Sequence, residues 1–123
     1  MTIKHEYETI YVSKAELSDD IQNELHGKIT NLITENGGEI LVEEKWGKRK
    51  MAYPINKKHY ANYVLLDYVA TADLIFKLER SMRLDDRFIR FLTVKIDEDV
   101  DVEGVREAAT ARHKRRVAKM SAQ

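Results

Sequence analysis

The residues best suited to bind a ligand lie in one short stretch of the sequence, WGKRKMAYPI. It contains three consecutive cations, Lys48, Arg49 and Lys50. Two aromatic residues, Trp46 and Tyr53, lie on either side of this cationic run. Cations held in register bind phosphate groups, and aromatic rings stack on unpaired bases. The combination therefore favours structured RNA over a regular DNA duplex as a ligand.

The net charge of the chain does not decide this question, because 21 Lys and Arg residues balance 21 Asp and Glu residues. The basic residues nevertheless fall into three groups. Beside the cationic run lie Lys45, Lys57 and Lys58; a second group contains Arg80, Arg83, Arg87 and Arg90; a third contains Arg106, Arg112, Lys114, Arg115, Arg116 and Lys119. Two other roles stay open for such residues: lysines on a protruding strand discourage strand addition, and arginines at a helix C-terminus complement its dipole. Trp46 likewise fits either a core position at a sheet edge or a base-stacking platform.

No set of residues typical of an enzyme stands out. The chain has no cysteine, and its four histidines are scattered without the spacing of a metal site. Ser13 and Ser18 lack a glycine elbow and a nearby base. Gly37 and Gly38 lack the lysine and the spacing of a phosphate-binding loop. We therefore expect no catalytic residues, no metal site, no cofactor and no small-molecule substrate.

The chain has 123 residues, 43% of them hydrophobic, which is enough for one folded domain. It contains no apolar run of about 18 residues and no signal-peptide core, so we expect a cytoplasmic protein that does not bind a membrane. After Ile96 the charges separate into an acidic block, residues 97–103, and a basic block, residues 105–119. Such blocks are typical of tails. We therefore predict a folded domain at residues 1–96 and a charged, flexible tail at residues 97–123.

The pattern of apolar residues predicts six elements in the order β-α-β-β-α-β. The predicted strands are residues 7–12, 39–46, 60–69 and 88–96, and the predicted helices follow Ser18 and Thr71. Each helix begins after a residue that favours the N-cap position and carries an apolar stripe at helical spacing. The fold class is therefore α+β, with a ferredoxin-like four-stranded antiparallel sheet and two helices on one face. The other face of the sheet is expected to be uncovered.

The segment between the second and third strands, from Gly47 to His59, is long for a hairpin connection. Met51, Tyr53 and Ile55 alternate along it, which indicates an extended backbone. We predict that the two strands continue beyond the sheet as a projecting hairpin, here called the arm. One side of the arm is expected to cover apolar surface, and the other side to carry the cationic run.

The stretches EEKWGKRKMAYPINKKHYANYVLLDY and LERSMRLDDRFIRFLTVK, in this order and at this distance, resemble ribosomal protein six of the bacterial small subunit. The resemblance covers residues 5 to 96. Its most specific positions are Trp46, Gly47, Arg49, Ala52, Tyr53, Pro54, Ile55, Tyr63, Leu65, Arg83, Asp86, Ile89 and Arg90. The C-terminus departs from the family, because some members end in long acidic tails and this chain carries a basic block there.

The resemblance implies a non-enzymatic component of the small ribosomal subunit in the cytoplasm. In that family the protein pairs with ribosomal protein eighteen, and the pair binds the central domain of small-subunit rRNA. Together with Lys48 and Lys50 of the cationic run, the positions expected to contact RNA or the partner are Arg49, Tyr53, Lys57, Lys58, Arg83, Arg87 and Arg90. The alternative is a ferredoxin-like metabolite-sensing or regulatory dimer module, since fold does not fix function. The turn SKAELSDD after the first strand lacks the glycine that such a sensor usually needs.

Overall fold

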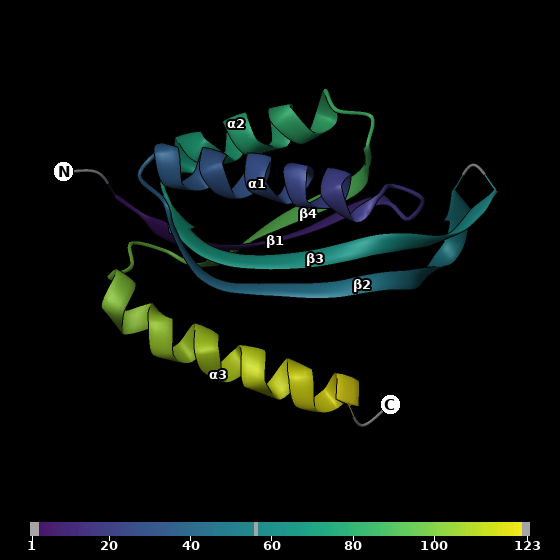
Figure 1. Ribbon diagram of the computed structural model, residues 1–123. Coiled ribbons are helices and arrows are strands. Elements are labelled where there is room, and N and C mark those ends of the chain that lie inside the picture. Colours follow the sequence, from purple (N-terminus) through teal and green to yellow (C-terminus); the bar gives the residue numbers. More distant parts are fainter. Residues whose placement is uncertain (1–2, 56, 122–123) are drawn as a thin grey trace.

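The computed structural model describes residues 3–55 and 57–121, which form a four-stranded sheet with helices on both faces (Figure 1). The strands are β1 (His5–Lys14), β2 (Glu39–Ile55), β3 (Lys58–Ala70) and β4 (Phe88–Asp97). The helices are α1 (Asp19–Glu35), α2 (Ala72–Arg83) and α3 (Val102–Ser121). The order of the first six elements confirms the predicted ferredoxin-like α+β fold.

The strands lie in the order β2-β3-β1-β4, and every neighbouring pair is antiparallel. Helices α1 and α2 pack on one face of this sheet, as predicted (Figure 1). Their apolar stripes meet apolar side chains of the strands in the main core, which includes Tyr7, Tyr11, Leu25, Ile29, Ile33, Val64, Leu66, Tyr68, Leu74, Leu78 and Met82. Burial of a large apolar side chain stabilises a fold by about 1.5–3 kcal/mol, so this core is the main source of stability.

Local signals set both ends of α1. Ser18 is the N-cap residue, and its Oγ accepts a hydrogen bond from the backbone N–H of Ile21 at 3.3 Å. Gly37 follows the helix with a φ of +80°, a conformation that glycine adopts without steric cost. Thr71 occupies the predicted N-cap of α2, but its side chain makes no capping hydrogen bond. It therefore marks the start of α2 without stabilising it as Ser18 stabilises α1.

Strands β2 and β3 extend past the sheet as the predicted arm, which projects from one end of the molecule (Figure 1). Pairing continues into the arm, where Lys50 lies opposite Tyr60 and Ile55 lies opposite Lys58. Gly47 sits at an irregularity of the ladder with a φ of +79°. A bulge of this kind bends the strand and increases its twist, which lets the arm leave the plane of the sheet.

The apolar side of the arm is anchored by a small second core. Met51 packs there with Val12 and Ala61, and all three side chains are buried. Tyr53 does not share this burial, because 61% of it is exposed. Asn56, which connects the two strands of the arm in the sequence, lies outside the described residues. The arm thus has an apolar attachment at its base and a solvated outer part.

The C-terminal segment differs from the expectation. Residues 102–121 form α3, which lies across the sheet face opposite α1 and α2 (Figure 1). Ala109 is the one buried side chain in the described part of this helix. Ion pairs between arginines of α3 and carboxylates of β1, β2 and β3 hold the helix in place. The prediction of an uncovered face was therefore wrong over these three strands, because it considered apolar contacts alone.

Candidate nucleic-acid interface

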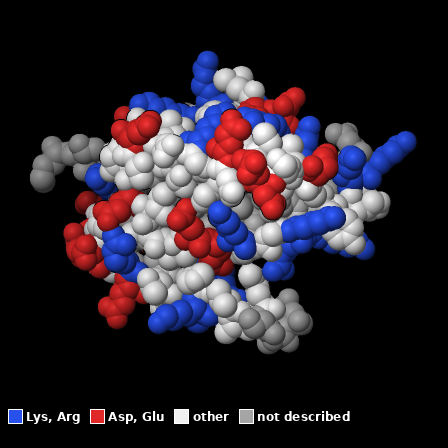
Figure 2. Space-filling model, in the orientation of Figure 1, with Lys and Arg blue, Asp and Glu red and all other residues white. Residues whose placement is uncertain are grey.

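The arm exposes cations that form no ion pair with any carboxylate among the described residues. Lys48, Arg49, Lys50, Lys57 and Lys58 are all exposed. None of them forms an ion pair with a carboxylate in the part of the chain that the structure describes. In Figure 2, basic side chains project from the end of the molecule that carries the arm. These charges are available to neutralise phosphate groups, with release of the counter-ions of the nucleic acid.

Aromatic rings lie against several of these cations. The Nζ atom of Lys48 is 5.2 Å from the ring centroid of Tyr60. The guanidinium carbon of Arg90 on β4 is 5.4 Å from the ring centroid of Tyr53, and its Nη2 donates a hydrogen bond to the Tyr53 hydroxyl at 3.4 Å. Both tyrosines remain largely exposed, Tyr53 at 61% and Tyr60 at 49%. The arm therefore presents cations and open ring faces side by side, as stacking on unpaired bases requires.

Trp46 lies at the base of the arm and is only partly buried. Its ring stacks on Tyr63, with 6.3 Å between the ring centroids and 16° between the planes. The guanidinium of Arg49 lies over the Trp46 ring, 5.8 Å from its centroid. The indole Nε1 donates a hydrogen bond to Glu44 Oε1 at 3.0 Å. Trp46 belongs to neither buried cluster, so the structure favours an accessible ring over the core position left open by the sequence.

The remaining predicted contact residues are not all brought to the arm. Arg90 contacts it through Tyr53, as described above. Arg83 on α2 instead lies over the ring of Phe91, 5.9 Å from its centroid. Arg87 forms two parallel hydrogen bonds with Asp85, at 2.9 and 2.8 Å, and these hold the pKa of that carboxyl well below its usual range. Arg87 is thus engaged in fixing the turn before β4.

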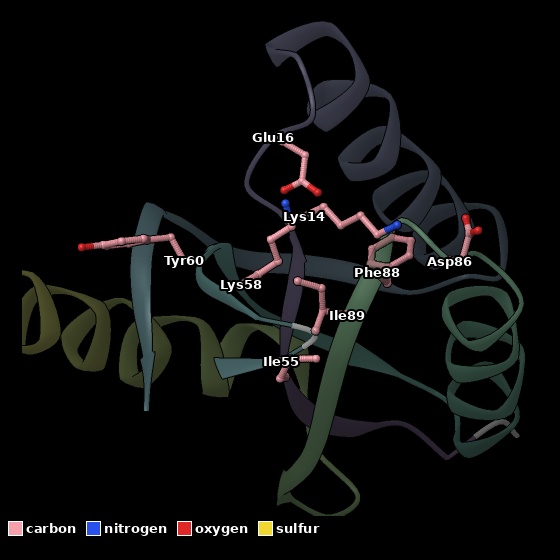
Figure 3. Close-up of a pocket in the computed structure, with 8 residues that line it drawn as sticks. All are labelled: Lys14, Glu16, Ile55, Lys58, Tyr60, Asp86, Phe88 and Ile89. Carbon is pink, nitrogen blue, oxygen red and sulfur yellow. The ribbon is translucent and has the colours of Figure 1, made fainter. Parts of the chain in front are cut away.

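A cavity of about 420 Å³ lies between the arm and the start of β4 (Figure 3). Its lining mixes apolar side chains with two lysines, two carboxylates and a tyrosine. These are Lys14, Glu16, Ile55, Lys58, Tyr60, Asp86, Phe88 and Ile89. The two carboxylates disfavour a phosphate group at this position, so the cavity fits the cationic character of the arm poorly.

Sequence reasoning missed the carboxylates beneath α3. Glu6, Glu44 and Asp67 are buried on the sheet; Arg112 pairs with Glu6 and Asp67, and Arg116 pairs with Glu44. Burial and a hydrogen bond with Asp67 raise the pKa of Glu6 to about 8, against the opposing effect of Arg112. Burial alone would raise the pKa of Glu44, but hydrogen bonds, that of Arg116 first, lower it on balance. Asp67 was detectable in the sequence as a carboxylate inside an otherwise apolar strand, and Glu44 as an exception on the apolar face of its strand.

One hydrogen-bonded chain resembles a proton relay. The Tyr11 hydroxyl and His26 Nδ1 are 2.8 Å apart, and His26 Nε2 and Glu43 Oε1 are 2.7 Å apart. The cavity beside it has a volume of only about 50 Å³, far below the roughly 300 Å³ of a small-molecule site.

Among the described residues, no group of three or more His, Asp or Glu side chains could hold a metal ion. None of the described helices combines the length and the apolar character needed to cross a membrane.

Comparison with known proteins gives a consistent assignment. The sequence profile of the family described as ribosomal protein S6 matches residues 6–95. The chain is 44% identical over 101 residues to small ribosomal subunit protein bS6 of Desulfatibacillum aliphaticivorans, which is 82% of this chain and 55% of that protein. It is 45% identical over 92 residues to small ribosomal subunit protein bS6 of Porphyromonas gingivalis, which is 75% of this chain and 79% of that protein.

The crystal structure of 30S ribosomal protein S6 from Thermotoga maritima is similar in fold. The TM-score is 0.72 at 21% sequence identity, and the match covers 89% of this chain and 98% of that chain. This chain spans about half the length of the first relative named above. The residues matched by the family profile end before α3 begins at Val102. Because that profile covers most of residues 1–96 and the identity exceeds 40%, the chain belongs to the ribosomal protein S6 family.

Proposed function

We propose that this chain is a structural component of the small ribosomal subunit in the cytoplasm and not an enzyme. It binds the central domain of small-subunit rRNA together with ribosomal protein eighteen. The observation that carries RNA binding is the arm, where five exposed cations without a described counter-charge lie beside exposed aromatic rings. The names of the similar proteins, all of the small subunit, support the ribosomal role.

The residues of the arm have different roles in RNA binding. The lysines and Arg49 neutralise phosphates, and Tyr53 offers its exposed ring to an unpaired base. Arg90 holds the Tyr53 ring through its stacking contact and hydrogen bond, so it positions that ring as well as adding charge. Arg83 and Arg87 belong to the proposed contact set by resemblance to the family, and they meet RNA or the protein partner on the side of the molecule that carries α1 and α2.

The surface proposed for the protein partner is on β4. This strand forms an edge of the sheet, and its alternate residues Leu92, Val94 and Ile96 point to one face. They are 60%, 47% and 39% exposed, because α3 lies over the other strands. An apolar row on an edge strand is typical of a site where another protein binds.

The arm can be tested by replacing Lys48, Arg49 and Lys50 with alanine. We expect unchanged folding, weaker binding to a central-domain rRNA fragment, and a salt dependence of log K that is smaller by about two to three units, since three phosphate contacts are lost. The control replaces Lys4, Lys77 and Arg80 with alanine, which removes the same charge elsewhere. Filter binding over a range of NaCl concentrations measures both variants.

The comparison of the two triple variants separates specific from general electrostatic binding. A selective loss in the arm variant supports the proposal. Equal losses in both variants mean that only the total charge matters, and an unchanged affinity and slope in the arm variant contradict the role of the arm.

A further inference from the structure

A second hollow, here called the arm–α3 pocket, lies where the base of the arm meets the C-terminal end of α3. In Figure 1, α3 runs beneath the sheet toward the end of the molecule from which the arm projects. The pocket has a volume of about 350 Å³, within the range of small-molecule sites, roughly 300–1,000 Å³. It is lined by Trp46, Arg49, Lys50, Tyr63, Arg116, Lys119 and Met120.

One wall of the pocket is a fixed pair of aromatic rings. Trp46 and Tyr63 are stacked nearly parallel, and the indole N–H is held by Glu44. The other carboxylate oxygen of Glu44 accepts a hydrogen bond from Arg116 Nε of α3 at 2.8 Å. A single carboxylate therefore links the ring at the base of the arm to the helix that closes the pocket. Such preorganisation lowers the cost of ordering the site when a ligand binds.

The cations around the pocket differ in availability. Arg116 forms an ion pair with Glu44, and its Nη1 atom lies 3.7 Å from Glu8 Oε2. Its charge is therefore already paired within the protein, and its role is to hold α3 on the sheet. Arg49, Lys50 and Lys119 form no ion pair with any carboxylate among the described residues. Arg49 already lies over the Trp46 ring, so a ligand ring would take the place of its guanidinium on that face. The ligand that fits these cations and a flat aromatic wall has an anionic group and a flat ring, as a nucleotide has.

The cavity shown in Figure 3 is of similar size but does not meet these requirements. Glu16 and Asp86 contribute negative charge to its lining, whereas the residues that line the arm–α3 pocket include no carboxylate. A phosphate would be repelled at the former and attracted at the latter. Of the two cavities, the arm–α3 pocket is therefore the better site for a ligand that carries a phosphate group.

We propose that the arm–α3 pocket binds one unpaired nucleotide of the RNA, with its base against the Trp46–Tyr63 rings and its phosphate on the surrounding cations. The inference rests on the proposed RNA binding of the arm and adds a second, single-strand-selective site to it. A duplex keeps its base faces stacked and cannot supply this contact. Arg116, Lys119 and Met120 lie outside the residues that match the family profile, so the pocket depends on a part of the chain beyond that match.

Trp46 is the only tryptophan in the chain and reports on its own site. Titration of the full chain with a single-stranded uridine octamer should quench its fluorescence, whereas a duplex of the same length should not. Lys119→Ala should weaken this quenching and lower the salt slope by about 0.7, the value for one phosphate of a single strand. Lys114→Ala is the matched control, because Lys114 is exposed on the same helix and does not line the pocket.

Photo-crosslinking with a bromouridine octamer gives a second readout. Adducts at Trp46 or Tyr63 support the pocket, and adducts confined to Tyr53 or Tyr60 overturn it. An absence of quenching, or equal effects of the two lysine variants, also overturns it. If the central-domain rRNA fragment still binds through the arm in that case, the proposed function stands without the pocket. If the octamer binds at Trp46 and the rRNA fragment does not bind, the pocket stands and the ribosomal proposal fails.

Discussion

The two faces of the sheet are covered by helices that are attached in different ways. Helices α1 and α2 bury the centres of their apolar stripes: Leu25, Ile29, Ile33, Leu74, Leu78 and Met82 are each no more than 1% exposed. Helix α3 buries only Ala109 among its described residues and is held by ion pairs with buried carboxylates. One face is thus joined by apolar burial and the other by charge.

The two helical layers should therefore respond to different conditions. Apolar burial is non-directional and insensitive to ionic strength over the usual range. A buried ion pair gains little net free energy, because the cost of desolvating both charges nearly offsets their attraction, yet losing one partner is costly. We therefore expect the α1–α2 layer to carry global stability and the α3 layer to dock conditionally.

The largest effect is expected from Leu78→Ala in α2. Leu78 is fully buried, so the substitution should lower the free energy of unfolding by about 2–5 kcal/mol. Chemical denaturation should give the same loss at low and at high salt. Phe76→Ala on the same helix is the control, because Phe76 is 79% exposed and its loss should stay within about 0.5 kcal/mol. A strongly salt-dependent loss for Leu78→Ala would contradict the proposed contrast between the faces.

A smaller effect is expected from Arg112→Ala in α3. Arg112 pairs with both Glu6 and Asp67, and hydrogen bonds to charged groups contribute about 1.5–3 kcal/mol. The loss cannot exceed the free energy of docking α3, because an undocked helix lets water solvate the two carboxylates. Hydrogen exchange should therefore accelerate in α3 and stay unchanged in β1 and β3.

The matched control for this variant is Arg115→Ala, since Arg115 is exposed on the same helix and forms no ion pair within the described part of the chain. It should leave the exchange of α3 unchanged. If Arg112→Ala instead accelerates exchange in the central strands as much as in α3, both faces belong to one cooperative unit and the contrast is lost.

The remaining test of the contrast uses pH. Burial, together with Asp67, raises the pKa of Glu6 from 4.5 to about 8, so folded Glu6 binds a proton more tightly than unfolded Glu6 does. Its contribution to stability is therefore fully present below about pH 4.5 and declines as pH rises toward about 8. Glu6→Gln keeps a neutral side chain at all pH values and should flatten this decline. Identical pH profiles of unfolding free energy for the parent chain and Glu6→Gln would refute the assignment.

The fold of residues 1–96 could be predicted because its signals are local. Ser18 and Gly37 mark the two ends of α1 through conformations that their own side chains permit. Helix α3 could not be predicted in this way, because its few large apolar residues give no stripe. Its partners Glu6, Glu44 and Asp67 lie far away in the sequence, and only the folded sheet brings them together. The domain boundary near residue 96 stays a prediction.

The candidate site was predictable in part for a similar reason. The cationic run and Tyr53 are neighbours in the sequence, so their joint exposure on the arm followed from the alternation of the strand. The contribution of Arg116 and Lys119 to the pocket could not be predicted from the sequence, because it depends on where α3 lies across the sheet. The carboxylate of Glu44 was visible as an exception on an apolar strand face, and its role became clear only with its two partners from β2 and α3 in place.

The strand order has a consequence for how the chain folds during its own synthesis. Strand β1 is made first but lies inside the sheet, between β3 and β4, and Glu6 is paired with Asp97 across almost the whole sequence. One edge of β1 therefore keeps its backbone N–H and C=O groups unpaired until β4, which ends at Asp97, has left the ribosome. Contacts of such large sequence separation slow folding, since the entropy of closing a long loop is lost before the pairing compensates for it. The nascent domain is thus completed late. Until β4 pairs with β1, the open edge of β1 is exposed to aggregation, which chaperones prevent.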